Sequence, residues 1–186
     1  MCTPVGHSLL GYTIYLSIKD SKKRDHWIVP VGIILVASLP DVDFIFGYLS
    51  GDPNRYHHFW THSLVFAGLF GIIAGAGIAG LFRRFSFRFG FLGFFVIFSH
   101  IFLDFFTKDT SAPLGMQLFW PFSDNFYLSS VSLFQDVYKA SSSSAFLKSL
   151  FVWHNLRTVL IEIAILGPML LFFWIRYSRN KELTGS

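Results

Sequence analysis

The chain has 186 residues, a length that fits one domain. Hydrophobic residues make up 53% of it and charged residues only 14%, and 24 residues are phenylalanine. Soluble proteins carry about 25% charged residues, so this composition excludes an ordinary soluble domain and indicates a membrane protein. The formal charge of +4 is small, and the basic residues form short clusters between apolar runs rather than one stripe. That pattern predicts membrane orientation, with membrane lipids as partners and no nucleic-acid partner.

The apolar runs predict an all-α fold: a single domain, residues 1–186, forming a polytopic membrane bundle of about five transmembrane or partly spanning helices. We expect helices near residues 4–18, 27–40, 62–82, 89–107 and 158–176, with an outer loop region over 108–157. The first two runs are shorter than the ~20 residues that span hydrocarbon alone, so they need tilt or shelter from neighbouring helices. The third run carries Gly and Ala at small-xxx-small spacing, which predicts close helix packing.

Basic clusters set the expected orientation. Ten of the fifteen Lys and Arg residues lie in three places: residues 19–24, 83–88 and 176–181. Because cytoplasmic loops carry an excess of Lys and Arg, five spans put the N-terminus outside and the C-terminus in the cytoplasm. We therefore expect a multi-pass protein of the inner (plasma) membrane. Its Asp and His residues would gather on the extracytoplasmic side.

Two aspartates and three histidines bracket the loop between the second and third runs. Asp41 and Asp43 follow Pro40, and a histidine group precedes residue 64, comprising His57, His58 and His62. Asp and His side chains bind hard or borderline divalent metals, and ionisable groups near membrane depth usually mark a functional site. The alternative for the two acids is a helix end with solvated carboxylates.

Further candidate ligands come from other helices. His100 and Asp104 are four residues apart, so they share one helix face and can bind one ion or two adjacent ions. His7 lies on the outer end of the first helix. Glu162, early in the last helix, either faces this site or pairs with a buried polar group.

Helical phase does not choose between His57 and His58 as the partner of His62 if the third helix begins near Thr61. We expect Thr61 and Ser63 to cap that helix or to hold a ligating histidine by a hydrogen bond.

Four motifs in order resemble one family: Thr3-Pro-Val-Gly-His7, Leu39-Pro-Asp-Val-Asp43, His57-His-Phe-Trp-Thr-His-Ser63 and Ser99-His-Ile-Phe-Leu-Asp104. They resemble the bacterial membrane-bound, metal-dependent hydrolases, some of which are described as LexA-binding inner-membrane proteins. The resemblance implies a metal site formed by His7, Asp41, Asp43, His57, His62, His100 and Asp104. The chain departs from the family where His-Arg is common, because His58 replaces that Arg. If the Arg binds an anionic group, His58 replaces it only when protonated, or Arg55 serves instead.

The ligand order is also similar, more loosely, to the zinc-dependent phospholipase C and single-strand nuclease group, which favours a phosphoester substrate. Seven or eight ligands exceed the needs of one tetrahedral zinc and suit two or more ions. We expect a divalent metal cofactor, zinc first, with manganese or iron as alternatives. The candidate catalytic residues are Asp41, Asp104 and His58, one of which moves protons.

The expected function is a hydrolase whose metal-activated water attacks a phosphoester of a lipid or lipid-linked substrate. Two alternatives belong to other classes. A metal-ion transporter needs ligands along both halves of the bilayer. A non-catalytic membrane scaffold recruits a cytoplasmic partner, for which only the short basic loops and the tail are available.

Overall fold

The structure, a computed structural model, describes residues 1–19, 27–81 and 87–183. These residues form helices without strands, apart from two isolated β-bridges, so the all-α prediction is confirmed. The helices are α1 (Pro4–Ile18), α2 (Ile28–Ala37), α3 (Asp43–Leu49), α4 (Leu64–Leu81), α5 (Phe87–Phe105), α6 (Ser143–Ser149) and α7 (Trp153–Leu183). Two short 3₁₀ helices, η1 (Leu39–Val42) and η2 (Trp60–His62), precede α3 and α4.

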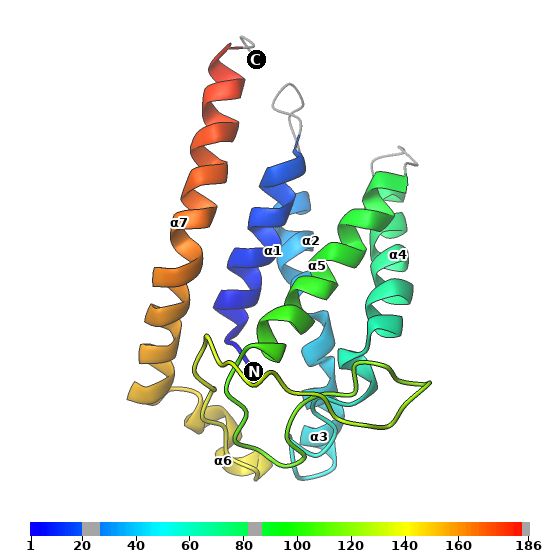
Figure 1. Ribbon diagram of the computed structural model, residues 1–186, viewed down its shortest axis with the longest axis vertical. Coiled ribbons are helices and arrows are strands. Elements are labelled where there is room, and N and C mark those ends of the chain that lie inside the picture. The colour runs from blue at the N-terminus through cyan, green and yellow to red at the C-terminus, as the bar shows by residue number, and fades with distance from the viewer. Residues whose placement is uncertain (20–26, 82–86, 184–186) are drawn as a thin grey trace.

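Helix α1 lies in the middle of the bundle, against α7, α5 and α2 (Figure 1). Its 15 residues give a length of about 22 Å, less than the ~30 Å of bilayer hydrocarbon. Neighbouring helices shelter it, and a buried apolar cluster joins α1 to α2 and α5: Tyr15, Leu16, Val29, Ile33, Ala37, Leu92 and Val96. The expected shelter of a short first helix is therefore confirmed.

Helices α4 and α5 pack backbone to backbone through glycine. A Cβ atom on Gly75 would lie 2.1 Å from the carbonyl oxygen of Phe89, and one on Gly93 would lie 2.1 Å from that of Gly71. Neither position has room for a larger residue. The small residues of the third apolar run therefore do what their spacing predicts, which is to permit close contact between two helices.

Two helices among the described residues, α5 and α7, are long and apolar enough to cross a membrane. Helix α2 and the segment Leu39–Leu49 add a third crossing if this pair, bent by 64°, counts as one broken span. The apolar part of α4, Leu64–Gly77, is shorter. Five spans are therefore not confirmed. Large apolar side chains on the outer faces are nonetheless exposed, as expected of helices in lipid, among them Leu69, Ile73, Phe91, Phe95, Leu171 and Phe172.

The two ends of the bundle differ in character (Figure 1). One end carries basic residues: Lys19 after α1, Arg88 in the first turn of α5 and three residues late in α7, Arg176, Arg179 and Lys181. The other basic residues of the predicted clusters, Lys22, Lys23, Arg24, Arg83 and Arg84, lie outside the described residues. The opposite end carries α3, α6 and the long irregular segment after α5.

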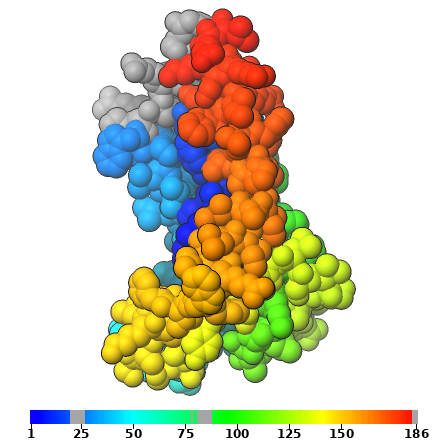
Figure 2. Space-filling model, turned by 90° about the vertical axis from the view of Figure 1, so that its left-hand side faces the viewer, coloured from blue at the N-terminus to red at the C-terminus, as the bar shows by residue number. Residues whose placement is uncertain are grey.

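The predicted outer loop contains more structure than its Ser-rich sequence suggests. Residues 143–149 form α6, and α7 begins at Trp153 rather than near residue 158. In Figure 2, α6 and the residues before it, drawn in yellow to gold, lie beside the lower end of α7. Phe146 of α6 packs on Phe44 of α3, with ring centroids 5.5 Å apart. This contact explains why a short serine-rich segment is ordered as a helix.

Candidate metal centre

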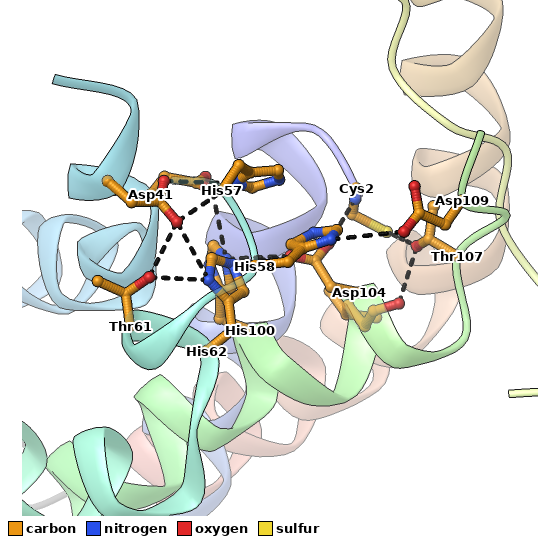
Figure 3. Close-up of polar contacts among 12 residues, drawn as sticks. Cys2, Asp41, His57, His58, Thr61, His62, His100, Asp104, Thr107 and Asp109 are labelled. Carbon is orange, nitrogen blue, oxygen red and sulfur yellow. Dashed lines mark hydrogen bonds and ion pairs between the residues drawn. The ribbon is translucent and has the colours of Figure 1, made fainter. Parts of the chain in front are cut away.

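Four segments bring the predicted ligands together at the end of the bundle that carries α3 and α6. His7 comes from the first turns of α1, the two aspartates from η1 and α3, the histidine group from the turn that runs into η2, and the last pair from the end of α5. Figure 3 shows six of these residues together: Asp41, His57, His58, His62, His100 and Asp104. Every one of these side chains is buried except Asp41, which is 14% exposed. The structure thus places all the sequence-predicted ligands in one cluster.

The first group of donors contains Asp41, His62, His100 and Asp104. The Nε2 atom of His100 lies 3.3 Å from Nε2 of His62, 3.2 Å from Asp104 Oδ2 and 3.5 Å from Asp41 Oδ1. His62 Nε2 lies 3.4 Å from the same Asp104 oxygen. Four donors bound to zinc at about 2.0–2.1 Å are separated by about 3.3–3.4 Å along the edges of a tetrahedron. The spacing therefore fits one ion of that size.

Hydrogen bonds on the far side of both imidazole rings fix this orientation. His100 Nδ1 lies 2.7 Å from the carbonyl oxygen of Ala37, so it must carry the proton and donate. His62 Nδ1 lies 3.0 Å from Thr61 Oγ1 and 3.3 Å from Asp43 Oδ2. In both rings Nε2 is then the atom directed at the centre of the group. A ligating histidine whose other nitrogen is held by a carbonyl or carboxylate is the usual arrangement in metal sites.

A second group shares Asp41 with the first and adds Asp43 and His57. His57 Nδ1 lies 3.2 Å from Asp43 Oδ1, and Thr61 Oγ1 donates to Asp43 Oδ2 at 2.9 Å. Phe44 stacks on the His57 ring with centroids 4.2 Å apart. His57, His58 and His62 also have ligand atoms close enough to share an ion. A second group of candidate ligand atoms therefore lies beside the first.

Several buried candidate metal-ligand atoms of the cluster have no hydrogen-bond partner among the described residues. They are both ring nitrogens of His7, Asp41 Oδ1, Asp104 Oδ2, and Nε2 of His57 and of His58. Buried polar atoms are nearly always paired, and each exception in a native fold asks for an unseen partner. Five neighbouring residues of the cluster leave such atoms without a partner, which fits a bound cation.

The N-terminal segment holds Asp104 from the other side. The backbone N–H of Cys2 donates to Asp104 Oδ1 at 2.6 Å, and His7 Nε2 lies 3.5 Å from that oxygen. The His7 ring also stacks on the His100 ring, with centroids 3.6 Å apart. Asp104 thus keeps one oxygen in hydrogen bonding and the other free toward the centre.

Glu162 holds the N-terminal segment in place and is not one of the candidate ligands. Its carboxylate accepts the backbone N–H of Thr3 at 2.7 Å and the Thr3 hydroxyl, and it is fully buried. A Cβ atom on Gly6 would lie 2.7 Å from its Oε2, so glycine leaves the space that the carboxylate fills. Of the two alternatives for Glu162, pairing with a buried polar group is the one observed.

His58 takes an unusual backbone position. Its φ angle is +68°, in the left-handed region that non-glycine residues rarely adopt and that often marks functional sites. Its Nε2 lies 3.9 Å from Asp104 Oδ2 and its Nδ1 lies 3.6 Å from Asp109 Oδ2. The turn at residues 57–59 thus directs both His57 and His58 to the cluster. Helical phase alone did not choose between these two histidines.

Neither His58 nor Arg55 supplies the positive charge that an arginine at position 58 would bring to the cluster. Burial lowers the pKa of His58 to about 3, so this ring is neutral at physiological pH. Arg55 is exposed, with its guanidinium 5.6 Å from the ring of Tyr56. Neither residue therefore provides a cation inside the cluster.

Sequence reasoning anticipated the supporting roles of Thr61 and Ser63 but missed two other contacts. Ser63 Oγ accepts the N–H of Phe66 at 3.1 Å and so caps α4. Asp109 was missed: burial alone would raise its pKa, but contact with His58 and backbone hydrogen bonds lower it to about 2. Its position just beyond the ligand-bearing end of α5 was the available signal. Cys2 acts through its backbone amide, which no side-chain pattern reveals.

A family model described as YdjM inner membrane protein matches residues 1–181. The chain belongs to the YdjM inner membrane protein family. The match covers every candidate ligand and all the described helices except the last two residues of α7, and the inner-membrane localisation rests on it. No curated protein and no solved structure matches the chain significantly. For this YdjM family member, the residues of the cluster are therefore the basis for proposing an activity.

Proposed function

We propose that this protein is a membrane-embedded, metal-dependent hydrolase that cleaves a phosphoester of a lipid or lipid-linked substrate. The observation that carries the proposal is the convergence of four donor atoms, one each from Asp41, His62, His100 and Asp104, at separations of 3.2–3.5 Å. This arrangement places electron-rich atoms together in a buried site, which requires positive charge between them.

Two ions would share the cluster. His62, His100, Asp41 and Asp104 would hold the first, while Asp43 and His57 would hold a second beside Asp41. Bound there, a divalent metal supplies a Lewis acid and a water of lowered pKa. Zinc suits the mixture of imidazole and carboxylate donors, and manganese or iron are the alternatives.

The chain's own residues would do the remaining work. Cys2 and His7 orient Asp104, so that one of its oxygens stays directed inward. His58 is neutral and its Nε2 has no hydrogen-bond partner among the described residues, so that atom can accept a hydrogen bond from a bound water or from the substrate. Asp41 is the one partly exposed carboxylate of the cluster, which makes it the residue best placed to exchange protons with solvent.

An apolar pocket beside the cluster supports a lipid substrate. It has a volume of about 530 Å³ and is lined by Asp43, Phe46, Leu49, Ser50, Tyr56 and Trp60. Asp43 is the single charged residue in that lining and also belongs to the second donor group. A substrate with its chain in this pocket would have its polar head at the donor atoms. The loop between Asp43 and His57 would then determine substrate specificity.

The position of the cluster supports an extracytoplasmic site. All its donors lie at one end of the bundle, and the described basic clusters lie at the other end, which the positive-inside rule places in the cytoplasm. A metal-ion transporter would need donors along both halves of the bilayer. The whole predicted ligand set lies at one end of the bundle, which favours the hydrolase.

The test is a hydrolysis screen with detergent-purified, zinc-loaded protein. The substrates are phosphatidic acid, a phosphodiester phospholipid and a polyprenyl phosphate, each compared with the water-soluble ester p-nitrophenyl phosphate. We expect turnover of at least one lipid phosphoester, faster than that of the soluble ester. His100→Ala should abolish it, and His154→Ala, a change in an exposed histidine outside the cluster, should leave it intact.

Two results would contradict the proposal. One is the absence of hydrolysis of every ester by metal-loaded protein. The other is equal turnover by wild type and the His100→Ala variant.

A further inference from the structure

An anionic phosphoester would meet four carboxylates at this site besides the metal ions proposed above. Asp41, Asp43, Asp104 and Asp109 all lie in or beside the cluster, and a carboxylate repels a phosphate in a partly buried site where screening by water is weak. Arg55, the one lysine or arginine in the loop between Asp43 and His57, is exposed. A positive side chain next to the metal centre would add to the charge of the metal ions and favour an anionic head group.

Lys139 occupies that position. Its Nζ lies 5.0 Å from the centre of the Phe44 ring, and Phe44 stacks in turn on His57. Burial lowers the pKa of Lys139, while the charges of Asp41 and Asp104 act in the opposite direction. The ammonium group is therefore within electrostatic reach of the cluster from outside it.

The ammonium group has no carboxylate within ion-pair distance in the part of the chain that the structure describes; its one recorded contact there is the Phe44 ring. A lysine held over an aromatic face keeps its hydrogen-bonding protons available for a ligand. This distinguishes Lys139 from a lysine that merely closes a salt bridge.

The backbone on both sides of Lys139 is fixed. Asn155 accepts the N–H of Tyr138 at 2.7 Å and donates to its carbonyl oxygen at 2.8 Å. On the other side, the N–H of Ala140 donates to Ser149 Oγ at 2.8 Å, and its carbonyl accepts from Asn54 at 3.4 Å. The segment is thus attached both to the start of α7 and to the loop that follows α3. Such attachment reduces the entropy lost when the side chain binds a ligand.

We propose that Lys139 is the anion-binding residue of this site, and that it pairs with a non-bridging phosphoryl oxygen of the substrate at the edge of the metal centre. The inference rests on the proposed function and adds to it the residue that selects an anionic head group. A lysine ammonium binds phosphate as a point charge, and its loss affects ligand binding rather than metal binding.

Inorganic phosphate is the probe. Its affinity for full-length, detergent-purified, zinc-loaded protein is measured by titration calorimetry, and the zinc content of each sample is measured by mass spectrometry. We expect Lys139→Met to weaken phosphate binding about tenfold or more with zinc content unchanged. Lys139→Arg should stay within about threefold of wild type. Lys148→Met, on the exposed face of α6, is the matched control and should bind phosphate as wild type does.

Asn155→Ala tests the positioning of the lysine without removing its charge. Because this change frees the backbone of Tyr138, phosphate affinity should fall by a smaller factor than in Lys139→Met. If this variant loses its fold, the Lys139→Met and Lys139→Arg pair still decides the question.

The outcomes separate this inference from the proposed function. Equal phosphate affinity of wild type and Lys139→Met overturns the role of Lys139 and leaves the metal centre untouched. Wild-type protein that binds zinc but no phosphate also overturns the role of Lys139 and leaves the metal centre untouched. Phosphate binding that depends on Lys139 in protein without stoichiometric metal supports the anion site and contradicts the hydrolase. Protein that binds neither zinc nor phosphate overturns both.

Discussion

Replacing Asp104 with asparagine separates metal binding from folding. Asp104 Oδ2 lies 3.2 Å from Nε2 of His100 and 3.4 Å from Nε2 of His62, so it is one of four donors around the first position. The amide that Asp104→Asn introduces keeps an oxygen for the N–H of Cys2, but it removes the negative charge from the centre. Its NH₂ group can donate to the imidazole nitrogens instead. The fold is therefore preserved while an ionic ligand is lost.

The expected loss can be estimated. Removing a group that only supports a metal ligand already weakens binding 10–100-fold, so loss of a ligand should cost at least about 100-fold. At a free zinc concentration 100 times the wild-type Kd, zinc stabilises wild type by about 2.7 kcal/mol and Asp104→Asn by only about 0.4 kcal/mol. For a chain of this length, the difference corresponds to roughly 5–10 °C in Tm.

The assay is thermal unfolding in detergent, with added zinc and with a chelator. We expect zinc to raise the Tm of wild type and to leave that of Asp104→Asn nearly unchanged. With chelator, Asp104→Asn should be at least as stable as wild type, because it removes a buried carboxylate that faces other electron-rich atoms. Asp136→Asn, outside the cluster, should respond to zinc as wild type does. An undiminished zinc response of Asp104→Asn would refute the assignment of this ligand.

Three further predictions test the support, the packing and the orientation. Glu162→Ala leaves two Thr3 donors without their acceptor, so the unfolding free energy in an SDS titration should fall by about 2–3 kcal/mol. An unchanged unfolding free energy would contradict the role of Glu162 in holding Thr3. Gly75→Ala should destabilise the protein by about 1–3 kcal/mol, whereas Gly77→Ala, with open space at its Cβ, should be neutral or stabilising, and equal effects would contradict close α4–α5 packing. A topology reporter fused after Ser142 should be active only outside the cytoplasm, and cytoplasmic activity there would place the site on the other side.

The ligand cluster could be predicted because its spacing is local. His100 and Asp104 share a helix face by their separation of four residues, and Asp41 and Asp43 lie at a helix end marked by Pro40. Each pair is defined by its own few residues, so tertiary packing only had to bring the pairs together. The boundaries of α1 were predictable for the same reason, since Thr3 caps a helix with Pro4 in its first turn.

Other features depend on contacts between distant segments. The number of spans was not predictable because α1 is short and sheltered, and α2 continues into a bent segment rather than a straight crossing. The segment from residue 106 to residue 142 has no helical period, so nothing local placed Lys139 near the cluster. The left-handed backbone of His58, which directs two adjacent histidines inward, also follows from the folded turn rather than from spacing.

Zinc K-edge X-ray absorption on the purified protein tests the central claim most directly. The account predicts stoichiometric zinc with nitrogen and oxygen neighbours at about 2.0–2.1 Å, outer-shell scattering from imidazole, and loss of this signal in Asp104→Asn. Protein without stoichiometric metal, or a zinc ion with a sulfur neighbour at about 2.3 Å from Cys2, would contradict it.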